Sequence, residues 1–197
     1  MKTEEKKKIV IGLTGQIACG KGVIKNFLIE HYQASDYRFS TILRDVLIRL
    51  GVEQSRENIQ KTSTLLRQTF GEDILAKVMA NDAKNDSHHF IVIDGIRRLA
   101  DIKYLKDVSG FFLVSVEADE KIRHQRVIER NENPGDDKKT FEGFLKDQQE
   151  ESEIQIPETM AKADFVVNNN GTWEELWEQI HNLVKKINEF DKNNRKN

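Results

Sequence analysis

The stretch IVIGLTGQIACGKG, residues 9–22, decides the fold of this chain. It begins with the continuous apolar run Ile9–Leu13, which is typical of a central parallel strand covered on both faces. Two glycines, Gly15 and Gly20, then enclose four residues and are followed by Lys21. Apolar residues at helical spacing come next, so the glycine-rich segment is predicted to be a loop between a strand and a helix.

A loop with this spacing of glycines and lysine binds phosphate when it lies between a strand and a helix. Its backbone N–H groups surround a phosphate chain, the lysine reaches the far end of that chain, and the helix directs its positive dipole end toward it. We therefore expect consecutive loop residues to bind a phosphate chain. These residues are Gly15, Gln16, Ile17, Ala18, Cys19, Gly20, Lys21, Gly22 and Val23.

One position departs from the commonest form of this loop. A Ser or Thr whose hydroxyl meets magnesium usually follows the lysine, whereas this chain has Gly22 and then Val23. Cys19 is interpreted as a small residue that the loop tolerates, because a helix N-terminus alone is weak evidence for a reactive thiol. An ordinary strand-to-helix turn is the alternative interpretation, and the agreement of motif, strand and helix argues against it.

The composition limits the classes of protein that remain. The chain has 197 residues, enough for one domain with a substantial core, and a formal net charge of −2, which does not favour a nucleic-acid partner. No segment approaches the roughly 18 apolar residues needed to span a bilayer, and the charged start, Met1–Lys8, lacks the apolar part of a signal peptide. The single cysteine agrees with a reducing compartment. We expect a cytoplasmic protein with no membrane partner.

Apolar patterning predicts an alternation of strands and helices along the rest of the chain. The further expected strands are Ala34–Phe39, Phe90–Ile93, Phe111–Val116 and Ala163–Asn168. The expected helices are Ser40–Leu50, one between the N-cap Ser55 and Gly71, Glu72–Asn85, Leu99–Val108, Glu120–Glu129, Phe141–Glu153 and one that begins after Thr172 with Glu175 in a capping box. The last helix is expected to bury Trp173 and Trp177. Such alternation predicts an α/β fold, a parallel sheet with helices on both faces.

Charged side chains gather where the predicted strands end. Asp94 follows the strand Phe90–Ile93, and Arg97 and Arg98 lie just beyond it, at the edge where ligands collect in parallel sheets. Arg44 lies in the helix after the second strand and is a second candidate for holding the phosphate of an acceptor. Two alternatives remain: the arginines form ordinary surface ion pairs, and Asp94 caps the following helix.

Three arginines share one face of the predicted helix Glu120–Glu129. Arg123, Arg126 and Arg130 lie at i, i+3 and i+7, a span of ~10 Å. They form either a solvated stripe or a phosphate clamp. Transfer of a phosphoryl group requires positive charge around the γ-phosphate, and Lys21 with Arg126 and Arg130 would supply it.

Taken together, these motifs resemble the P-loop nucleoside monophosphate kinase superfamily. The residues that carry the resemblance are Gly15–Gly22, Leu43-Arg44, Asp94-Gly95-Ile96-Arg97-Arg98, Arg126-Val127-Ile128-Glu129-Arg130 and Asn168-Asn169-Asn170-Gly171. Adenylate kinases share the Gly-Lys-Gly end of the loop, and dephospho-CoA kinases share the general layout. The stretch Ser55–Ala83 resembles deoxynucleoside monophosphate kinase-like proteins. Adenylate kinases place Thr after Gly-Lys-Gly, so Val23 is a departure from their pattern.

The resemblance implies a single three-layer P-loop domain over residues 1–197 with a five-stranded parallel sheet and with ATP and Mg²⁺ as cofactors. Its core would comprise 8–38, 86–125 and 154–190, with a helical acceptor-binding insert at about 39–85 and a lid at about 126–153. The implied catalytic residues are Lys21, Arg126, Arg130 and Asp94, and the implied acceptor-binding residues are Arg44, Arg97 and Arg98. Asn168 and Gly171 would flank the adenine, and Asp94 would meet Mg²⁺ through water, with Asp36 as another candidate.

The favoured function is transfer of the γ-phosphate of ATP to a nucleoside or deoxynucleoside monophosphate, because arginines are expected on both sides of the loop. One alternative is dephospho-CoA kinase-like transfer to a sugar hydroxyl, which needs a base such as Asp36. A third is an ATP-binding switch or slow ATPase, favoured by the missing loop hydroxyl. Small-molecule nucleotides are the expected partners, and the sequence leaves the oligomeric state open. Arg56 and Arg67 lie in the implied insert and are interpreted as structural.

Overall fold

A five-stranded parallel sheet with the strand order β2-β3-β1-β4-β5 forms the centre of the structure, a computed structural model. The structure describes residues 8–132, 135–150 and 153–193, of which 191–193 are described as backbone only. The strands are β1 (Ile9–Thr14), β2 (Ser35–Arg38), β3 (Phe90–Ile96), β4 (Phe111–Glu117) and β5 (Phe165–Asn168). The apolar run Ile9–Leu13 lies in the central strand β1, and the chain folds as the α/β protein that the sequence predicts.

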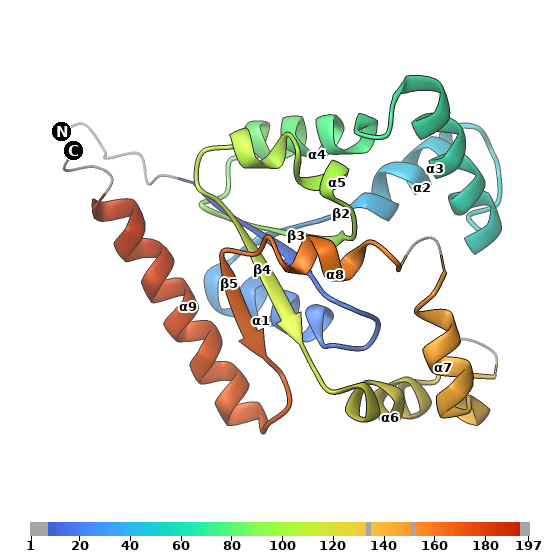
Figure 1. Cartoon of the computed structure of the whole chain (residues 1–197). Helices are drawn as coiled ribbons and strands as arrows, with labels where there is room; N and C mark the ends of the chain where they lie inside the picture. The colour runs from blue at the N-terminus through green and yellow to red at the C-terminus, as the bar shows by residue number, and fades with distance from the viewer. Residues whose placement is uncertain (1–7, 133–134, 151–152, 194–197) are drawn as a thin grey trace.

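Helices connect the strands in the described part of the chain. They are α1 (Lys21–Tyr32), α2 (Phe39–Arg49), α3 (Arg56–Phe70), α4 (Ile74–Asn85), α5 (Leu99–Ile102), α6 (Glu120–Arg130), α7 (Phe141–Asp147), α8 (Ile156–Met160) and α9 (Trp173–Asn193). Two short 3₁₀ helices, η1 (Leu105–Asp107) and η2 (Asp136–Lys138), complete the set. Strand β4 leads directly to α6 at the carboxyl edge of the sheet (Figure 1).

The two faces of the sheet are covered by different helices. Helices α1 and α9 pack on one face, and α2, α4 and α5 pack on the other (Figure 1). Alternate residues of β1 divide between these layers, with Ile9, Ile11 and Leu13 toward α1 and α9 and Val10 toward α2 and α4. A strand buried on both faces explains why its sequence is continuously apolar.

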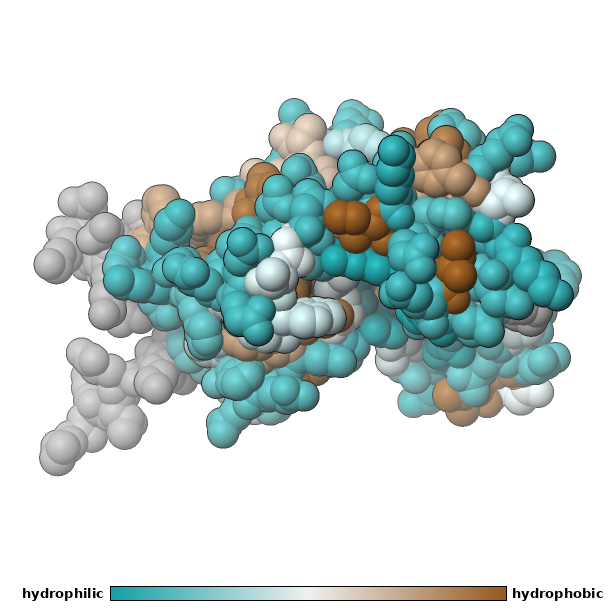
Figure 2. All heavy atoms as spheres, turned by 90° about the horizontal axis from the view of Figure 1, so that it is seen from below, coloured by the Kyte–Doolittle hydropathy of each residue, from teal (hydrophilic) through white to brown (hydrophobic). Residues whose placement is uncertain are grey.

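The surface is mostly polar on the face that Figure 2 presents, where hydrophobic residues appear as separated patches among hydrophilic ones. Isolated apolar side chains of this kind are normal on the surface of a folded protein. Among the helices of the described residues, none combines the length and the apolar composition that a bilayer span demands.

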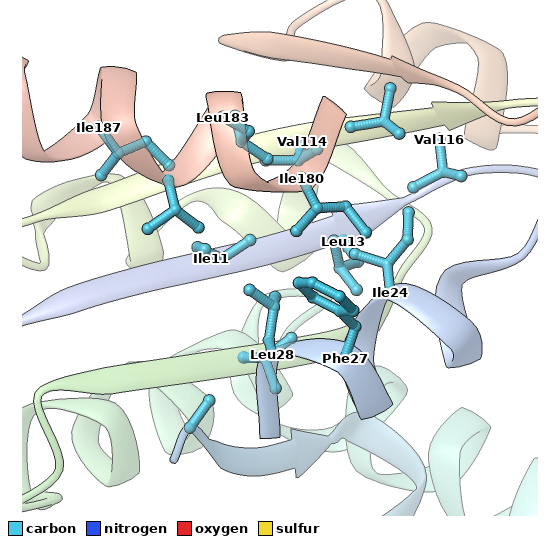
Figure 3. Packing of buried hydrophobic residues seen from close by; sticks show 14 of the residues in the cluster. Ile11, Leu13, Ile24, Phe27, Leu28, Val114, Val116, Ile180, Leu183 and Ile187 are labelled. Atoms are coloured by element: carbon cyan, nitrogen blue, oxygen red, sulfur yellow. The ribbon is translucent and has the colours of Figure 1, made fainter. Parts of the chain in front are cut away.

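The core on the α1 and α9 side joins the first and last parts of the chain. Helix α1 contributes Ile24, Phe27 and Leu28, and helix α9 contributes Ile180, Leu183 and Ile187. Both sets pack on the sheet residues Ile11, Leu13, Val114 and Val116 (Figure 3). All ten of these side chains are buried. The helix that follows the glycine-rich loop is thus fixed by apolar contacts on its inner face, which holds the loop at the edge of the sheet.

Several local predictions are confirmed. Ser55 caps α3 by accepting a hydrogen bond from the Asn58 N–H at 3.3 Å, and Gly71 ends that helix. Thr172 and Glu175 form the expected capping box, with the Thr172 N–H donating to Glu175 at 2.8 Å and the Glu175 N–H donating to Thr172 at 3.3 Å. These signals depend on residues close in sequence, so they can be identified without the tertiary structure.

Other predicted boundaries are wrong. Strand β3 continues to Ile96 because its far end still pairs with β1 and β2, so Asp94 lies within the strand. The predicted helix Leu99–Val108 ends at Ile102 and resumes only as η1. The predicted helix Phe141–Glu153 ends at Asp147. The last helix continues to Asn193, although a frayed end was expected from Asp191.

The prediction that Trp173 of α9 is buried is wrong. The residue is 56% exposed, because it lies in the first turn of the helix beyond the edge of the core. Trp177 is half-buried and stacks on Phe27 with ring centroids 4.6 Å apart. Residues 1–7, 133–134, 151–152 and 194–197 lie outside the described residues, and so do the parts of the predicted start, loop, lid and C-terminal end that fall on them.

A buried ion pair connects α3 to the segment after β3. Arg67 donates to Asp101 at 2.8 Å, and the two side chains are 7% and 4% exposed. Arg67 also donates to the backbone oxygen of Glu72, and the second oxygen of Asp101 accepts the N–H groups of Arg97 and Arg98 at 3.1 Å each. Asp101 therefore fixes the backbone beyond β3, and Arg67 holds α3 against it.

Replacement of Arg67 by alanine is expected to lower the free energy of unfolding by about 3–5 kcal/mol, because Asp101 would remain buried without its charged partner. Urea unfolding measures this change. Arg56→Ala is the matched control: Arg56 pairs with Glu150 at 3.4 Å, and because both side chains are largely exposed its loss should cost at most about 1 kcal/mol. Equal losses in the two variants would show that the buried pair does not hold α3.

Candidate functional site

The glycine-rich loop encloses the ammonium group of Lys21. Helix α1 begins at Lys21 directly after Gly20, and the side chain turns back over the loop. Its Nζ donates to the backbone oxygens of Gly15 at 2.5 Å and Gln16 at 3.2 Å and lies 3.6 Å from the Cys19 sulfur. A cation is therefore held inside the curve of the loop at the positive end of a helix, which is a suitable arrangement for an anion.

The turn after β5 supports the loop from behind. Asn169 is 4% exposed and donates its Nδ2 to the backbone oxygen of Cys19 at 2.8 Å. Gly20 has φ of +105°, and a Cβ at this position would collide with the Asn169 amide. Both facts require glycine at this position. Asn169 was named from the sequence only as part of the motif Asn168–Gly171 and was given no role of its own, because nothing in the run Asn168–Asn170 distinguishes the asparagine that points inward.

The two residues that depart from the common motif have different surroundings. A Cβ on Gly22 would meet no atom within 4 Å, so the space for a side chain exists there. Val23 is partly buried and packs against the core between α1 and α9. Its apolar side chain belongs to the packing of α1, which gives the position a structural reason and leaves the loop without a hydroxyl at either residue.

Arg126 contacts the turn after β5, the same turn that supports the loop through Asn169. One of its terminal nitrogens donates to the Asn169 backbone oxygen at 3.0 Å and to the Asn169 side-chain oxygen at 3.4 Å. Its other terminal nitrogen is buried and has no hydrogen-bond partner among the described residues. The structure thus brings Arg126 beside the turn that was expected to flank the adenine. Arg130, one turn further on, is exposed and pairs with Glu132 at 3.1 Å.

The expected adenine-flanking residues make contacts with α9. The backbone N–H and oxygen of Asn168 both bond the Gln179 amide, at 2.9 and 2.8 Å. Gly171 adjoins the capping box of α9, and a Cβ there would collide with the Glu175 carboxylate. Both positions are exposed.

Arg123 is a buried residue behind the loop. It is 1% exposed and donates to the backbone oxygens of Ala118 at 3.1 Å and Ile17 at 3.3 Å. A third bond runs to the side-chain oxygen of Gln148 at 2.9 Å. Burial lowers the pKa of Arg123 from its ordinary value, and the nearby Glu120 carboxylate, 3.8 Å away, opposes this shift. Of the three arginines on α6, Arg123 is therefore the one built into the protein interior.

Asp94 lies at the carboxyl end of the sheet. One carboxylate oxygen pairs with Arg38 at 3.2 Å, and the other is buried without a hydrogen-bond partner among the described residues. Asp94 does not cap α5, whose N-cap is Arg98. Asp36, the other candidate carboxylate, pairs with the buried Lys25 at 2.8 Å. Sequence reasoning missed Arg38, which precedes α2 and carries no motif signal.

The candidate acceptor arginines differ in their partners. Arg97 pairs with Glu153 at 2.7 Å, and Arg98 pairs with Glu72 at 3.1 Å. Arg44 is exposed on α2 and forms no ion pair with any described residue. The arginines after β3 are thus matched by carboxylates, whereas Arg44 carries a charge without such a partner.

A cavity of about 270 Å³ opens beside the loop and is lined by Gln16, Glu120, Gln148, Gln149, Glu153, Ile154 and Pro157. Three carboxamides and two carboxylates make its wall polar. The cavity lies between the loop and the segments that follow α7.

Among the described residues, no group of three or more His, Cys, Asp or Glu side chains is arranged to hold a metal ion. Mg²⁺ needs only one or two protein carboxylates, since it keeps several waters and binds substrate phosphates. The buried, unpartnered oxygen of Asp94 fits that requirement.

The model of the AAA_17 family, described as an AAA domain, matches residues 14–144 of this chain. The chain belongs to this family. The match begins at the end of β1 and ends in α7, so it includes the whole phosphate loop. The AAA_17 family match and the sheet order together confirm the predicted P-loop kinase-like superfamily and its α/β fold.

Relatives with similar sequences share nearly the full length of this chain. A UPF0200 protein of Methanococcus maripaludis is 26% identical over 180 residues, covering 90% of this chain and 97% of the relative. A UPF0200 protein of Methanococcus vannielii is 28% identical over 182 residues, with coverages of 90% and 96%. One of Saccharolobus islandicus is 27% identical over 181 residues, with coverages of 90% and 93%.

Solved structures share the fold of this chain. A shikimate kinase from Bacteroides thetaiotaomicron has a TM-score of 0.60 at 12% identity, with 91% of this chain and 98% of that chain covered. TT1252 from Thermus thermophilus has a TM-score of 0.56 at 16% identity, with coverages of 92% and 98%. At these identities the likeness establishes the kinase-like fold, and it carries no statement about the substrate.

Two loop glycines provide a matched pair of variants. Gly20→Ala should weaken ATP binding at least tenfold and destabilise the protein by about 1–3 kcal/mol, because it forces a Cβ into the Asn169 amide at a positive φ. Gly22→Ala should raise the free energy of unfolding by about 0.4–1 kcal/mol, since the position is helical and open. Thermal unfolding and ATP titration measure both changes. Similar behaviour of the two variants would contradict the loop geometry.

Proposed function

We propose that this AAA_17 protein is an ATP-dependent phosphotransferase. The observation that carries the proposal is the enclosure of the Lys21 ammonium by the loop at the N-terminus of α1. The γ-phosphate of ATP requires this combination of a cation, backbone N–H groups and a helix dipole. Mg²⁺ bound with ATP supplies charge neutralisation of the phosphates, and the Asp94 carboxylate would hold one of its water ligands.

The favoured acceptor is a nucleoside or deoxynucleoside monophosphate. A phosphate acceptor arrives already ionised, so it needs arginines to hold it and no general base. Arg44 supports this choice, since its exposed guanidinium has no acidic partner in the described chain. The insert at about 39–85 would bind this acceptor through Arg44, with Arg97 and Arg98 facing it from the end of β3.

The lid at about 126–153 would close over the donor, with Arg126 and Arg130 contributing positive charge. Arg126 is held beside the loop by Asn169, which limits it to the donor side of the reaction. Asn168 and Gly171 would flank the adenine through backbone groups. We infer a cytoplasmic location for this chemistry, in agreement with the single buried cysteine.

A second candidate is transfer to a hydroxyl of the acceptor. Two observations favour it: Arg97 and Arg98 are paired with carboxylates, and Asp94 keeps a buried oxygen without a partner. Asp94 in this position could accept the proton of a hydroxyl as it attacks. Asp36, the base considered from the sequence, is less suited because Lys25 already pairs with it.

Product analysis with a panel of acceptors tests these proposals. The protein is incubated with magnesium-ATP and ribo- and deoxynucleoside monophosphates, dephospho-CoA and shikimate, and any phosphorylated product is identified. Lys21→Ala should reduce the transfer rate by about 10²–10³-fold with unchanged thermal stability, because it removes a charge that stabilises the transition state. If wild-type protein binds ATP and phosphorylates none of these acceptors, an ATP-binding switch or slow ATPase replaces the kinase proposal.

Arg44→Ala separates the two acceptor classes. With a monophosphate acceptor it should raise the acceptor KM about tenfold or more, since it removes a charged hydrogen-bond donor to a phosphate. Arg49→Ala on the same helix, also exposed, is the matched control and should leave the KM unchanged. Steady-state kinetics at saturating ATP provides the comparison. An unchanged KM in Arg44→Ala would remove this residue from acceptor binding.

A further inference from the structure

The end of α7 is bonded directly to the phosphate loop by one side-chain oxygen. The Oε1 of Gln148, the residue that caps α7, accepts the Gln16 amide at 2.8 Å and the Arg123 guanidinium at 2.9 Å. An amide oxygen has two acceptor positions, so both are used. Gln148 comes 132 residues after Gln16 in the chain, and neither glutamine was singled out as a connection between these elements.

Arg123 extends this contact to the next residue of the loop. Its guanidinium donates to the Ile17 backbone oxygen and lies 5.3 Å from the Phe144 ring of α7. Arg123 and Phe144 are 1% and 0% exposed. The consecutive loop residues 16 and 17 are thus both held from the side of α6 and α7, one through a side chain and one through the backbone.

Loss of the Gln148 oxygen would remove an acceptor from two donors at once, the Gln16 amide at the cavity wall and the buried Arg123 guanidinium. Of the described residues, only the Glu120 carboxylate, at 3.8 Å, would remain near that Arg123 nitrogen. Arg123 would lose one of its three neutral acceptors while buried, and a charged donor without a partner in the interior costs more than a neutral one. Relief of that cost requires water to enter or Arg123 to move, and Arg123 is bonded to Ile17. A change at α7 therefore reaches the loop backbone through a continuous set of hydrogen bonds.

We propose that Gln148 is a positioning residue that couples docking of α7 to the conformation of the phosphate loop, so that ATP binding and α7 docking stabilise each other. The coupling must act in both directions, because a ligand that favours the docked state is bound more tightly by it. The inference rests on the proposed function in one respect, that the loop binds ATP.

The first test measures binding of magnesium-ATP by calorimetric titration of the full chain. Gln148→Leu should weaken binding about five- to thirtyfold. Gln148→Glu keeps an oxygen that accepts from both Gln16 and Arg123, so it should bind within about threefold of wild type. Gln125→Leu, an exposed residue on α6 that bonds only Glu129 in the described structure, is the matched control and should bind as wild type does.

A second readout distinguishes coupling from mere packing. Hydrogen exchange of the α7 amides should slow on addition of magnesium-ATP in wild type and in Gln148→Glu, and this protection should be lost in Gln148→Leu. If Gln148→Leu lowers only the melting temperature, with unchanged ATP affinity and unchanged ATP-dependent protection, Gln148 is structural and the proposal fails. It fails equally if Gln148→Glu is as impaired as Gln148→Leu.

Gln16→Met, which removes the loop's side of the contact, keeps the proposal testable if Gln148→Leu does not fold. Gln16→Met should weaken ATP binding when it is made in the wild-type chain. It should weaken ATP binding to a similar degree when it is made in Gln148→Glu, because that variant retains the acceptor oxygen. Where Gln148→Leu does fold, the double variant with Gln16→Met should lose markedly less ATP affinity than the two single losses added together. Wild-type protein that binds no ATP refutes this inference and the proposed function together, whereas ATP binding without acceptor phosphorylation refutes only the latter.

Discussion

The hydrogen bond from the Asn169 amide to the Cys19 backbone oxygen links the two ends of the fold at the loop, and the other features of the site depend on it. Its partners are 150 residues apart, and Asn169 directly follows β5, so the bond depends on the place of β5 beside β4 in the sheet. The amide occupies the space that a side chain on Gly20 would need. The curve that encloses Lys21 is therefore fixed by the last strand of the sheet as well as by the loop's own glycines.

Features of the fold that depend on neighbouring residues were predictable from the sequence. The strand Ile9–Thr14, the start of α1 at Lys21 and the caps at Ser55 and Thr172 all follow from short-range patterns. Contacts between distant residues were not. The sequence shows Arg67, Arg123, Asn169 and Gln148 as polar residues among many, and the donor or acceptor that each one meets is set by packing of elements far apart in the chain.

Counting arginines in the sequence overestimates the positive charge available to an acceptor. Arg97 and Arg98 each lie within ion-pair distance of a glutamate, from the segment before α8 and from the turn before α4. A phosphate that binds either arginine must compete with a carboxylate already in place, and the exchange of one anion for another gains less than the pairing of a bare cation. Selectivity among acceptors would therefore depend on Glu153 and Glu72 as much as on the arginines themselves.

The missing hydroxyl of the loop can be understood from the two sides of α1. Val23 faces the core against the sheet and α9, where a threonine would bury a hydroxyl among apolar side chains. Gly22 faces open space, so nothing in the packing forbids a hydroxyl there. On the proposed reaction, its absence would leave magnesium to be held at the sheet edge by Asp94. This residue is 9% exposed, and one of its carboxylate oxygens is buried without a protein partner among the described residues. On the proposed reaction, one carboxylate would then orient the metal's water shell, which joins metal binding to the acceptor side of the site.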